Sequence, residues 1–148
     1  MGLIMSLNAK KIFLDTAPLI YYIEENPLYT GVLNDLFTTG KTKKNQFISS
    51  VVTLIEVLVL PLREGKTELA ETYKQILTGS HSIEIVDINV DISVIAARLR
   101  ADKALKTPDA IQVATAIYTS SDYFLTNDKR LKSINEIEVI TVDELSSI

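Results

Sequence analysis

Four acidic residues begin, interrupt or end apolar stretches of this sequence: Asp15, Glu56, Asp109 and Asp128. A carboxylate beside or inside buried surface costs several kcal/mol unless it is paired or bound to a metal. The chain has 1 histidine and no cysteine, so a shared partner would be a hard cation that prefers oxygen ligands. If the four acids meet in space, they predict a site for Mg²⁺ or Mn²⁺.

Each acid also has a purely structural explanation. Asp15 could form a turn at the end of a strand, and Asp109 could complement the dipole of the helix that it opens. Asp128 could cap a short helix over residues 129–134. Glu56 could occupy a single exposed stripe on a mostly buried helix. The metal site would be rejected only if all four structural explanations were correct at once. That combination is improbable, so the four acids together favour a metal-binding function.

The composition limits the class of protein. A chain of 148 residues with 47% hydrophobic residues is long enough to form one globular domain, which we predict to span residues 1–148. The net charge of −4 and the pI near 5.0 argue against a protein that coats nucleic acid, but not against an enzyme that acts on it. The absence of cysteine suits a reducing cytoplasm, and no apolar stretch is long enough to cross a membrane.

Strand patterns and helix patterns alternate along the chain. The strand patterns cover residues 11–14, 46–49, 83–88, 123–126 and 138–141. The helix patterns cover residues 16–25, 29–39, 68–77 and 90–105, a segment that Ser50 would cap and that bends or ends near Pro61, and a segment that Thr107 would cap. This alternation predicts a three-layer α/β domain with a mainly parallel central sheet flanked by helices.

The positions of the acids in these elements permit them to converge. Asp15 and Asp128 follow apolar strands directly, and ligands of open α/β sheets bind at the carboxyl ends of the strands. Glu56 and Asp109 are expected in or near the first turns of helices that begin at the same edge.

Two other chemistries are excluded. Gly40, Lys41 and Thr42 are similar to the end of a phosphate-binding loop, but Asp35 stands where that loop requires a glycine. His81 is the only histidine, so neither a histidine-pair ribonuclease nor a histidine-based triad is available.

Four segments together are similar to one known family. They are Ile-Phe-Leu-Asp-Thr at 12–16, Ser-Ser-Val-Val-Thr-Leu-Ile-Glu-Val-Leu at 49–58, Thr-Pro-Asp-Ala-Ile-Gln-Val-Ala-Thr-Ala at 107–116 and Phe-Leu-Thr-Asn-Asp at 124–128. In this order they resemble the acid-bearing segments of PIN-domain proteins, closest in style to the VapC-type toxins of toxin–antitoxin pairs. The resemblance covers nearly the whole chain, and no acid of the pattern is missing.

The resemblance implies an Mg²⁺- or Mn²⁺-dependent endoribonuclease, the cytoplasmic toxin of a toxin–antitoxin system. Its metal cage would be formed by Asp15, Glu56, Asp109 and Asp128, which agrees with the chemistry argued from the residues themselves. Thr126, and less strongly Asn127, would orient a ligand or water from behind the acids. The family also implies a cognate antitoxin and a homodimer. The alternative is a non-catalytic interaction module that keeps the fold.

An acidic site that cuts a polyanion needs nearby positive charge. Lys129, Arg130 and Lys132 directly follow Asp128 and are the best candidates for binding the RNA backbone. A second basic cluster, formed by Lys41, Lys43 and Lys44, has no sequence signal that places it near the acids.

Overall fold

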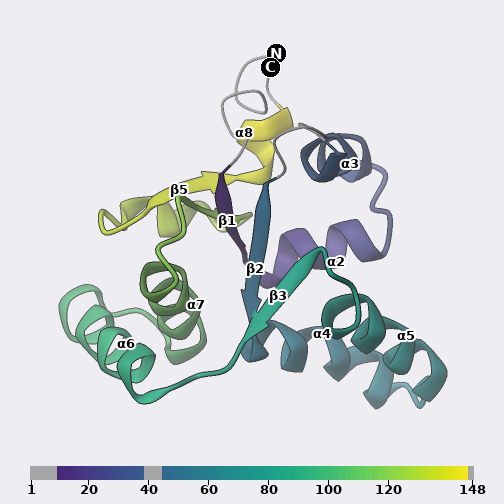
Figure 1. The fold of residues 1–148 in the computed structure, drawn as a ribbon, viewed down its shortest axis with the longest axis horizontal. Coiled ribbons are helices and arrows are strands. Elements are labelled where there is room, and N and C mark those ends of the chain that lie inside the picture. The colour runs from purple at the N-terminus through teal and green to yellow at the C-terminus, as the bar shows by residue number, and fades with distance from the viewer. Residues whose placement is uncertain (1–9, 39–44, 147–148) are drawn as a thin grey trace. The chain divides into compact units, whose positions relative to one another are not determined.

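The computed structural model describes residues 10–38 and 45–146 (Figure 1). Its five strands form one parallel sheet, flanked by helices, in the order β3–β2–β1–β4–β5. The strands are β1 (Lys11–Leu14), β2 (Gln46–Ser50), β3 (Ile83–Val86), β4 (Tyr123–Thr126) and β5 (Glu138–Thr141). The predicted α/β class with its parallel sheet is confirmed, and only the strand expected over 83–88 is shorter than predicted.

The register of the central strands brings distant segments side by side. Strand β1 pairs with β4 in parallel, with Leu14 opposite Leu125. Phe13 and Phe124 stack within this pair, with their ring centroids 5.3 Å apart and both side chains fully buried. Short apolar strands that are buried on both faces are typical of parallel sheets, which explains why these strands read as continuous apolar runs.

The described residues form eight helical segments. They are α2 (Thr16–Ile23), α3 (Thr30–Thr38), α4 (Val51–Arg63), α5 (Thr67–Thr78), α6 (Val90–Lys103), α7 (Thr107–Tyr118), the 3₁₀ helix η1 (Lys129–Ser133) and α8 (Val142–Ser146). Among the helices described, none combines the length and apolar character needed to cross a membrane.

The helices differ from the sequence-based predictions at three points. The sequence allowed α4 to bend or to end near Pro61, and the helix does not end there but continues to Arg63. Thr107 is the first residue of α7 and not its cap, since Lys106 occupies the cap position and makes no side-chain capping bond. Helix α8 was not predicted, because its five residues are too few to show a periodic pattern.

Residue contacts divide the chain into two compact units. Unit 1 comprises Met1–Phe47 and Ser121–Ile148, and unit 2 comprises Ile48–Ser120. The boundary falls within β2, whose first residue is held in unit 1 by a hydrogen bond of 2.8 Å from the Gln46 amide to the Lys10 carbonyl. The expectation of a single domain over residues 1–148 stays a prediction.

Truncation of the stacked pair tests the packing of unit 1. Phe124→Ala removes a fully buried ring and is expected to lower the free energy of unfolding by about 3–5 kcal/mol. The control is Val90→Ala, at a side chain that is 78% exposed, for which we expect a change of about 0.5 kcal/mol or less. Urea unfolding followed by circular dichroism measures both. Equal losses in the two variants would contradict the described core.

Candidate functional site

Unit 1 joins two of the predicted acids through one hydroxyl group. Asp15 follows β1 and caps α2, with its Oδ1 accepting a hydrogen bond from the Thr16 amide at 2.9 Å. The Thr126 hydroxyl, at the end of β4, donates to Asp15 Oδ2 at 2.8 Å. The same hydroxyl oxygen accepts a hydrogen bond from the Asp128 amide at 3.0 Å. The fully buried Thr126 thus fixes the Asp15 carboxylate and the backbone that carries Asp128.

The Asp128 carboxylate is paired with Arg130. Arg130 Nε donates to Asp128 Oδ1 at 3.0 Å and its second guanidinium nitrogen donates to Oδ2 at 2.6 Å, which is a two-pronged ion pair. The Arg130 amide also donates to Oδ1 at 3.0 Å, so Asp128 caps η1 as its structural explanation predicted. The hydrogen bonds from the Arg130 side chain lower the pKa of Asp128, against the opposing effect of burial.

The Asn127 side chain rests on two tyrosines. Its Nδ2 donates to the Tyr21 hydroxyl at 3.1 Å, while its Oδ1 is buried and has no hydrogen-bond partner among the described residues. Tyr21 stacks on Tyr29, with the ring centroids 4.6 Å apart. The Tyr29 hydroxyl donates to Asp143 at 2.9 Å, and this bond raises the pKa of Tyr29. The stacked tyrosines beside Asn127 had no signal in the sequence, because they come from α2 and from the turn before α3, which meet only in the fold.

The basic residues that follow Asp128 in the chain contact different partners. Lys132 donates from Nζ to the Val139 carbonyl at 2.9 Å and pairs with Glu144 at 2.8 Å. Burial opposes ionisation of Glu144, but the hydrogen bonds from Lys132 and Thr141 outweigh it and lower the pKa of this carboxyl. Lys132 therefore ties η1 to β5 and the start of α8, which weakens its assignment to RNA. The residues 41–44 lie outside the described residues.

Unit 2 carries the other two acids on helices α4 and α7. Asp109 lies in the first turn of α7 and is half-buried, as its position in the sequence suggested. Glu56 lies in the second turn of α4, near the first turn as expected, and its side chain is exposed. Its neighbour Ile55 is 61% exposed, so α4 is not the mostly buried helix that the sequence indicated.

A buried polar cluster connects the same two helices. The Ser50 hydroxyl accepts a hydrogen bond from the Val52 amide at 3.1 Å and donates to Gln112 Oε1. Gln112 Nε2 donates to the Thr53 hydroxyl at 2.6 Å. The sequence did contain a signal for it, because Gln112 is a lone polar residue between Ile111 and Val113.

The described acids do not form a complete metal site. Among residues 10–38 and 45–146, no three acidic or histidine side chains gather closely enough to hold a cation. Asp15 and Asp128 are linked within unit 1, whereas Glu56 and Asp109 belong to unit 2. The four-carboxylate cage therefore stays a prediction.

The donor chemistry nonetheless fits a hard divalent cation. Every candidate ligand offers carboxylate oxygen, and hydrogen bonds from Thr16 and Thr126 orient Asp15 as outer-shell groups orient metal ligands. Asp128 fits less directly, because a cation would have to displace the guanidinium of Arg130 from its oxygens.

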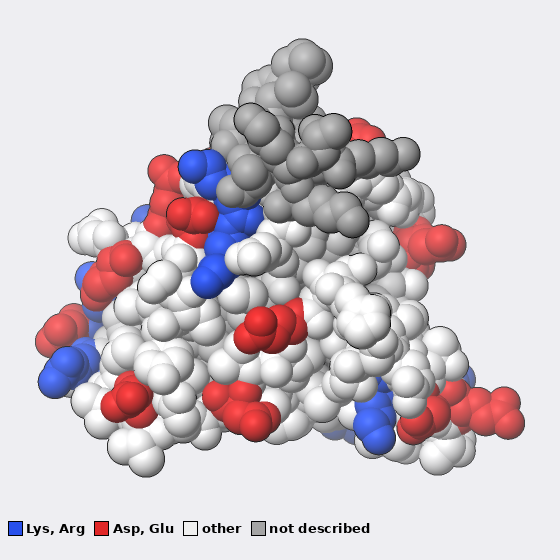
Figure 2. All heavy atoms as spheres, in the orientation of Figure 1, with Lys and Arg blue, Asp and Glu red and all other residues white. Residues whose placement is uncertain are grey.

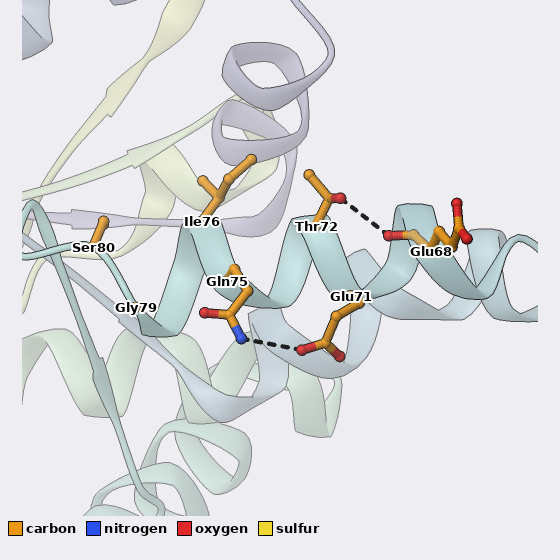
Figure 3. A pocket seen from close by; sticks show the side chains of 7 residues that line it. All are labelled: Glu68, Glu71, Thr72, Gln75, Ile76, Gly79 and Ser80. Atoms are coloured by element: carbon orange, nitrogen blue, oxygen red, sulfur yellow. Dashed lines mark hydrogen bonds between the residues drawn. The ribbon is translucent and has the colours of Figure 1, made fainter.

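A hollow on unit 2 does not involve the predicted residues (Figure 3). It has a volume of about 590 Å³ and follows one face of α5, where Gln75 donates to Glu71 at 3.0 Å. Its lining contains Glu68, Glu71, Thr72, Gln75, Ile76, Gly79 and Ser80. The hollow is open to solvent, and most of its lining residues lie on one face of the single helix α5. We therefore do not assign it to the predicted chemistry.

Comparison with known proteins identifies the family to which the chain belongs. The model of the PIN domain matches residues 12–137, a span that contains all four acids. A comparison with curated protein sequences gave no match.

Several solved structures share the fold at low sequence identity. The VapBC2 complex of Rickettsia felis bound to promoter DNA matches with a TM-score of 0.69 and 19% identity, over 88% of this chain and 98% of that one. DNA-bound VapBC from Salmonella typhimurium matches with a TM-score of 0.68 and 18% identity, over 90% and 98% of the two chains. VapC20 of Mycobacterium tuberculosis, a toxin that cleaves the sarcin–ricin loop, matches with a TM-score of 0.64 and 16% identity, over 85% and 98%.

The ion pair between Asp128 and Arg130 gives a pH-dependent prediction. The pKa of Asp128 is lower in the folded chain than in the unfolded one, so the ionised carboxylate stabilises the fold above about pH 4. This contribution is lost as the pH falls through the lowered folded-state pKa. Arg130→Gln is expected to cost no more than about 1 kcal/mol at pH 7, and the difference from wild type is expected to shrink at pH 3.

Urea unfolding at the two pH values measures this difference, and carboxyl-detected NMR follows the pKa of Asp128. Lys129→Gln is the matched control, because it removes the same charge from the adjacent exposed position. An unchanged Asp128 pKa in Arg130→Gln would contradict the described pairing.

Proposed function

Because the chain belongs to the PIN-domain family, we propose that it is an Mg²⁺- or Mn²⁺-dependent endoribonuclease and the toxin of a toxin–antitoxin pair. The observation that carries the proposal is the Thr126 hydroxyl, which orients Asp15 and holds Asp128 at the carboxyl ends of β1 and β4. This is the sheet edge where open α/β folds bind their ligands. VapC20, whose solved structure is similar to this chain, cleaves the sarcin–ricin loop, and this supports RNA as the substrate.

In this proposal Asp15, Glu56, Asp109 and Asp128 hold the metal. A bound divalent cation would activate water and stabilise the charge that develops on the phosphodiester. Thr126 holds the Asp15 carboxylate in one orientation, and α2 begins at the residue that follows Asp15 in the chain. Asn127, placed by Tyr21, has a buried amide oxygen without a partner in the described residues, which suits it to accept a hydrogen bond from a buried water molecule.

RNA binding would depend on a few local cations. On the face of the described residues drawn in Figure 2, acidic and basic side chains are interspersed and do not form one broad basic surface. Lys129 is exposed, and the side chain of Arg130 is 78% exposed beside Asp128. We therefore assign the phosphate contacts to Lys129 and Arg130, and not to Lys132.

The proposal includes a cognate antitoxin and a homodimer in the cytoplasm. Similar solved structures are toxin–antitoxin complexes, among them one from Klebsiella pneumoniae at 24% identity and a TM-score of 0.66. Helix α4 also exposes apolar area that association would cover, with Ile55 at 61%, Leu60 at 53% and Leu62 at 53% exposure.

The alternative function is a non-catalytic interaction module with the same fold. One observation favours it: Arg130 already neutralises the Asp128 carboxylate, so this acid needs no cation to be stable. The two functions differ in their response to metal.

Metal addition and one conservative variant test the proposal. We expect millimolar Mn²⁺ to raise the melting temperature and to support RNA cleavage, because a cation binds the folded acids better than the unfolded ones. Asp15→Asn keeps the helix cap, since Asn and Asp cap equally well, but it removes the charge. We expect cleavage to fall more than about 100-fold, beyond the loss typical of removing an outer-shell partner.

The matched control is Asp91→Asn, at an exposed acid in the first turn of α6, which should keep both responses. Thermal melts with and without Mn²⁺ and sequencing of cleaved RNA ends provide the readouts. A wild-type protein that neither cleaves RNA nor responds to Mn²⁺ or Mg²⁺ would favour the interaction module instead.

The division of the basic cluster predicts two different variant phenotypes. In an Asp15→Asn background, Lys129→Ala with Arg130→Ala should flatten the salt dependence of single-stranded RNA affinity by about 0.7 in slope for each lost contact. Lys132→Ala should instead destabilise the fold and leave the slope unchanged, because Lys132 holds Val139 and Glu144. Affinity measured against salt concentration decides; a change of slope in Lys132→Ala alone would reverse the assignment.

A further inference from the structure

Four side chains form a fully buried polar cluster in unit 2, which we name the Gln112 cluster. Its members are Ser49, Ser50, Thr53 and Gln112, each 0–1% exposed. Thr53 Oγ1 accepts hydrogen bonds from the Ser49 hydroxyl at 2.8 Å and from Gln112 Nε2 at 2.6 Å. The Ser50 hydroxyl caps α4 at the Val52 amide and donates to Gln112 Oε1. The amide of Gln112 therefore uses both of its ends to hold the first turn of α4.

Stability alone does not explain this cluster. Buried hydrogen bonds contribute little net stability compared with well-packed apolar side chains of the same shape, whereas a buried polar group without its partner is strongly unfavourable. Such a cluster consequently penalises every arrangement of the two helices except the one that satisfies all of its members. Its physical effect is to fix the rotation and axial position of α4 against α7.

The helix positions that the cluster fixes lie one turn from the two acids of unit 2. Thr53 lies three residues before Glu56 on α4, and Gln112 lies three residues after Asp109 on α7. Residues three apart are neighbours on a helix surface, so a rotation of either helix that broke the cluster would also redirect its acid. Glu56 is exposed and Asp109 is half-buried, so neither acid is held in place by burial alone.

We propose that the Gln112 cluster is a positioning device for Glu56 and Asp109. Its hydrogen bonds set the azimuth and register of α4 and α7, and through them the direction in which each carboxylate is presented to a divalent cation. Gln112 and Thr53 are positioning residues that act through the acids and do not contact the cation. This inference rests on the proposed function, in which Glu56 and Asp109 are metal ligands.

Four variants test the proposal in the full-length chain. Gln112→Met and Thr53→Val keep the side-chain shape and remove the hydrogen bonds, whereas Thr53→Ser keeps the hydroxyl group. Thr115→Val is the matched control, because Thr115 is also fully buried on α7 but its hydroxyl donates to the Ile111 carbonyl of its own helix at 2.7 Å. The measurements are Mn²⁺ affinity from the electron paramagnetic resonance signal of free Mn²⁺, and the melting temperature without metal.

We expect Gln112→Met and Thr53→Val to weaken Mn²⁺ binding by about tenfold, the lower end of the loss seen when groups that orient metal ligands are removed. Thr53→Ser should restore wild-type affinity, and Thr115→Val should retain it even if its melting temperature falls. A purely structural role would instead make affinity follow the melting temperature across the four variants.

The outcomes separate this inference from the proposed function. Wild-type Mn²⁺ affinity in both Thr53→Val and Gln112→Met, beside a wild type that binds Mn²⁺, overturns the inference and leaves the function standing. A wild type that binds no Mn²⁺ overturns the proposed function and the inference together. If Gln112→Met does not fold, the comparison of Thr53→Val with Thr53→Ser still decides, because equal affinities in that pair overturn the inference.

Discussion

The parallel pairing of β1 with β4 is the constraint on which the site in unit 1 depends. The two strands are joined by a hydrogen bond between side chains 111 positions apart, from Thr126 to Asp15. Because parallel strands end at the same edge, the residue after Leu14 and the residue after Leu125 must emerge together. A register shift by one residue would turn the side chains of one strand to the opposite face of the sheet and separate Thr126 from Asp15. The stacked rings of Phe13 and Phe124 oppose that shift.

Different groups contact the two acids of unit 1. Asp15 accepts hydrogen bonds from an amide and from a hydroxyl group, which orient its carboxylate. Asp128 is neutralised by the guanidinium of Arg130, which lowers its pKa. If a cation binds as proposed, Arg130 is released from Asp128 where the negatively charged substrate arrives. The same arginine can then serve as a counter-ion before binding and as a phosphate contact after it.

Unit 2 uses buried hydrogen bonds for a purpose that apolar packing does not serve. Helix α4 buries only part of its length, with Val52, Thr53, Val57 and Pro61 inside and much of its apolar surface exposed. Apolar contacts are non-directional and leave a helix free to rotate by small amounts. The hydrogen bonds of Gln112 are directional, and they fix the helix at the end from which Glu56 is presented.

The sequence by itself determined the α/β class, the bounds of β1, β4 and β5, and the positions of the acids at strand and helix ends, because periodicity, capping residues and apolar runs are local signals. It also identified the PIN-domain family through four short segments in order. For Glu56 the sequence left open a single exposed stripe on a mostly buried helix; Glu56 is exposed, but so is its neighbour Ile55, because an apolar helix pattern does not reveal how much of the helix another element covers. Only the tertiary structure separated Lys132, tied to Glu144, from Arg130, tied to Asp128, because three adjacent basic residues are equivalent until their neighbours in space are known. Thr126 had a predicted place beside the acids, but its double hydrogen bond to Asp15 and Asp128 depends on strand register, which no local pattern encodes.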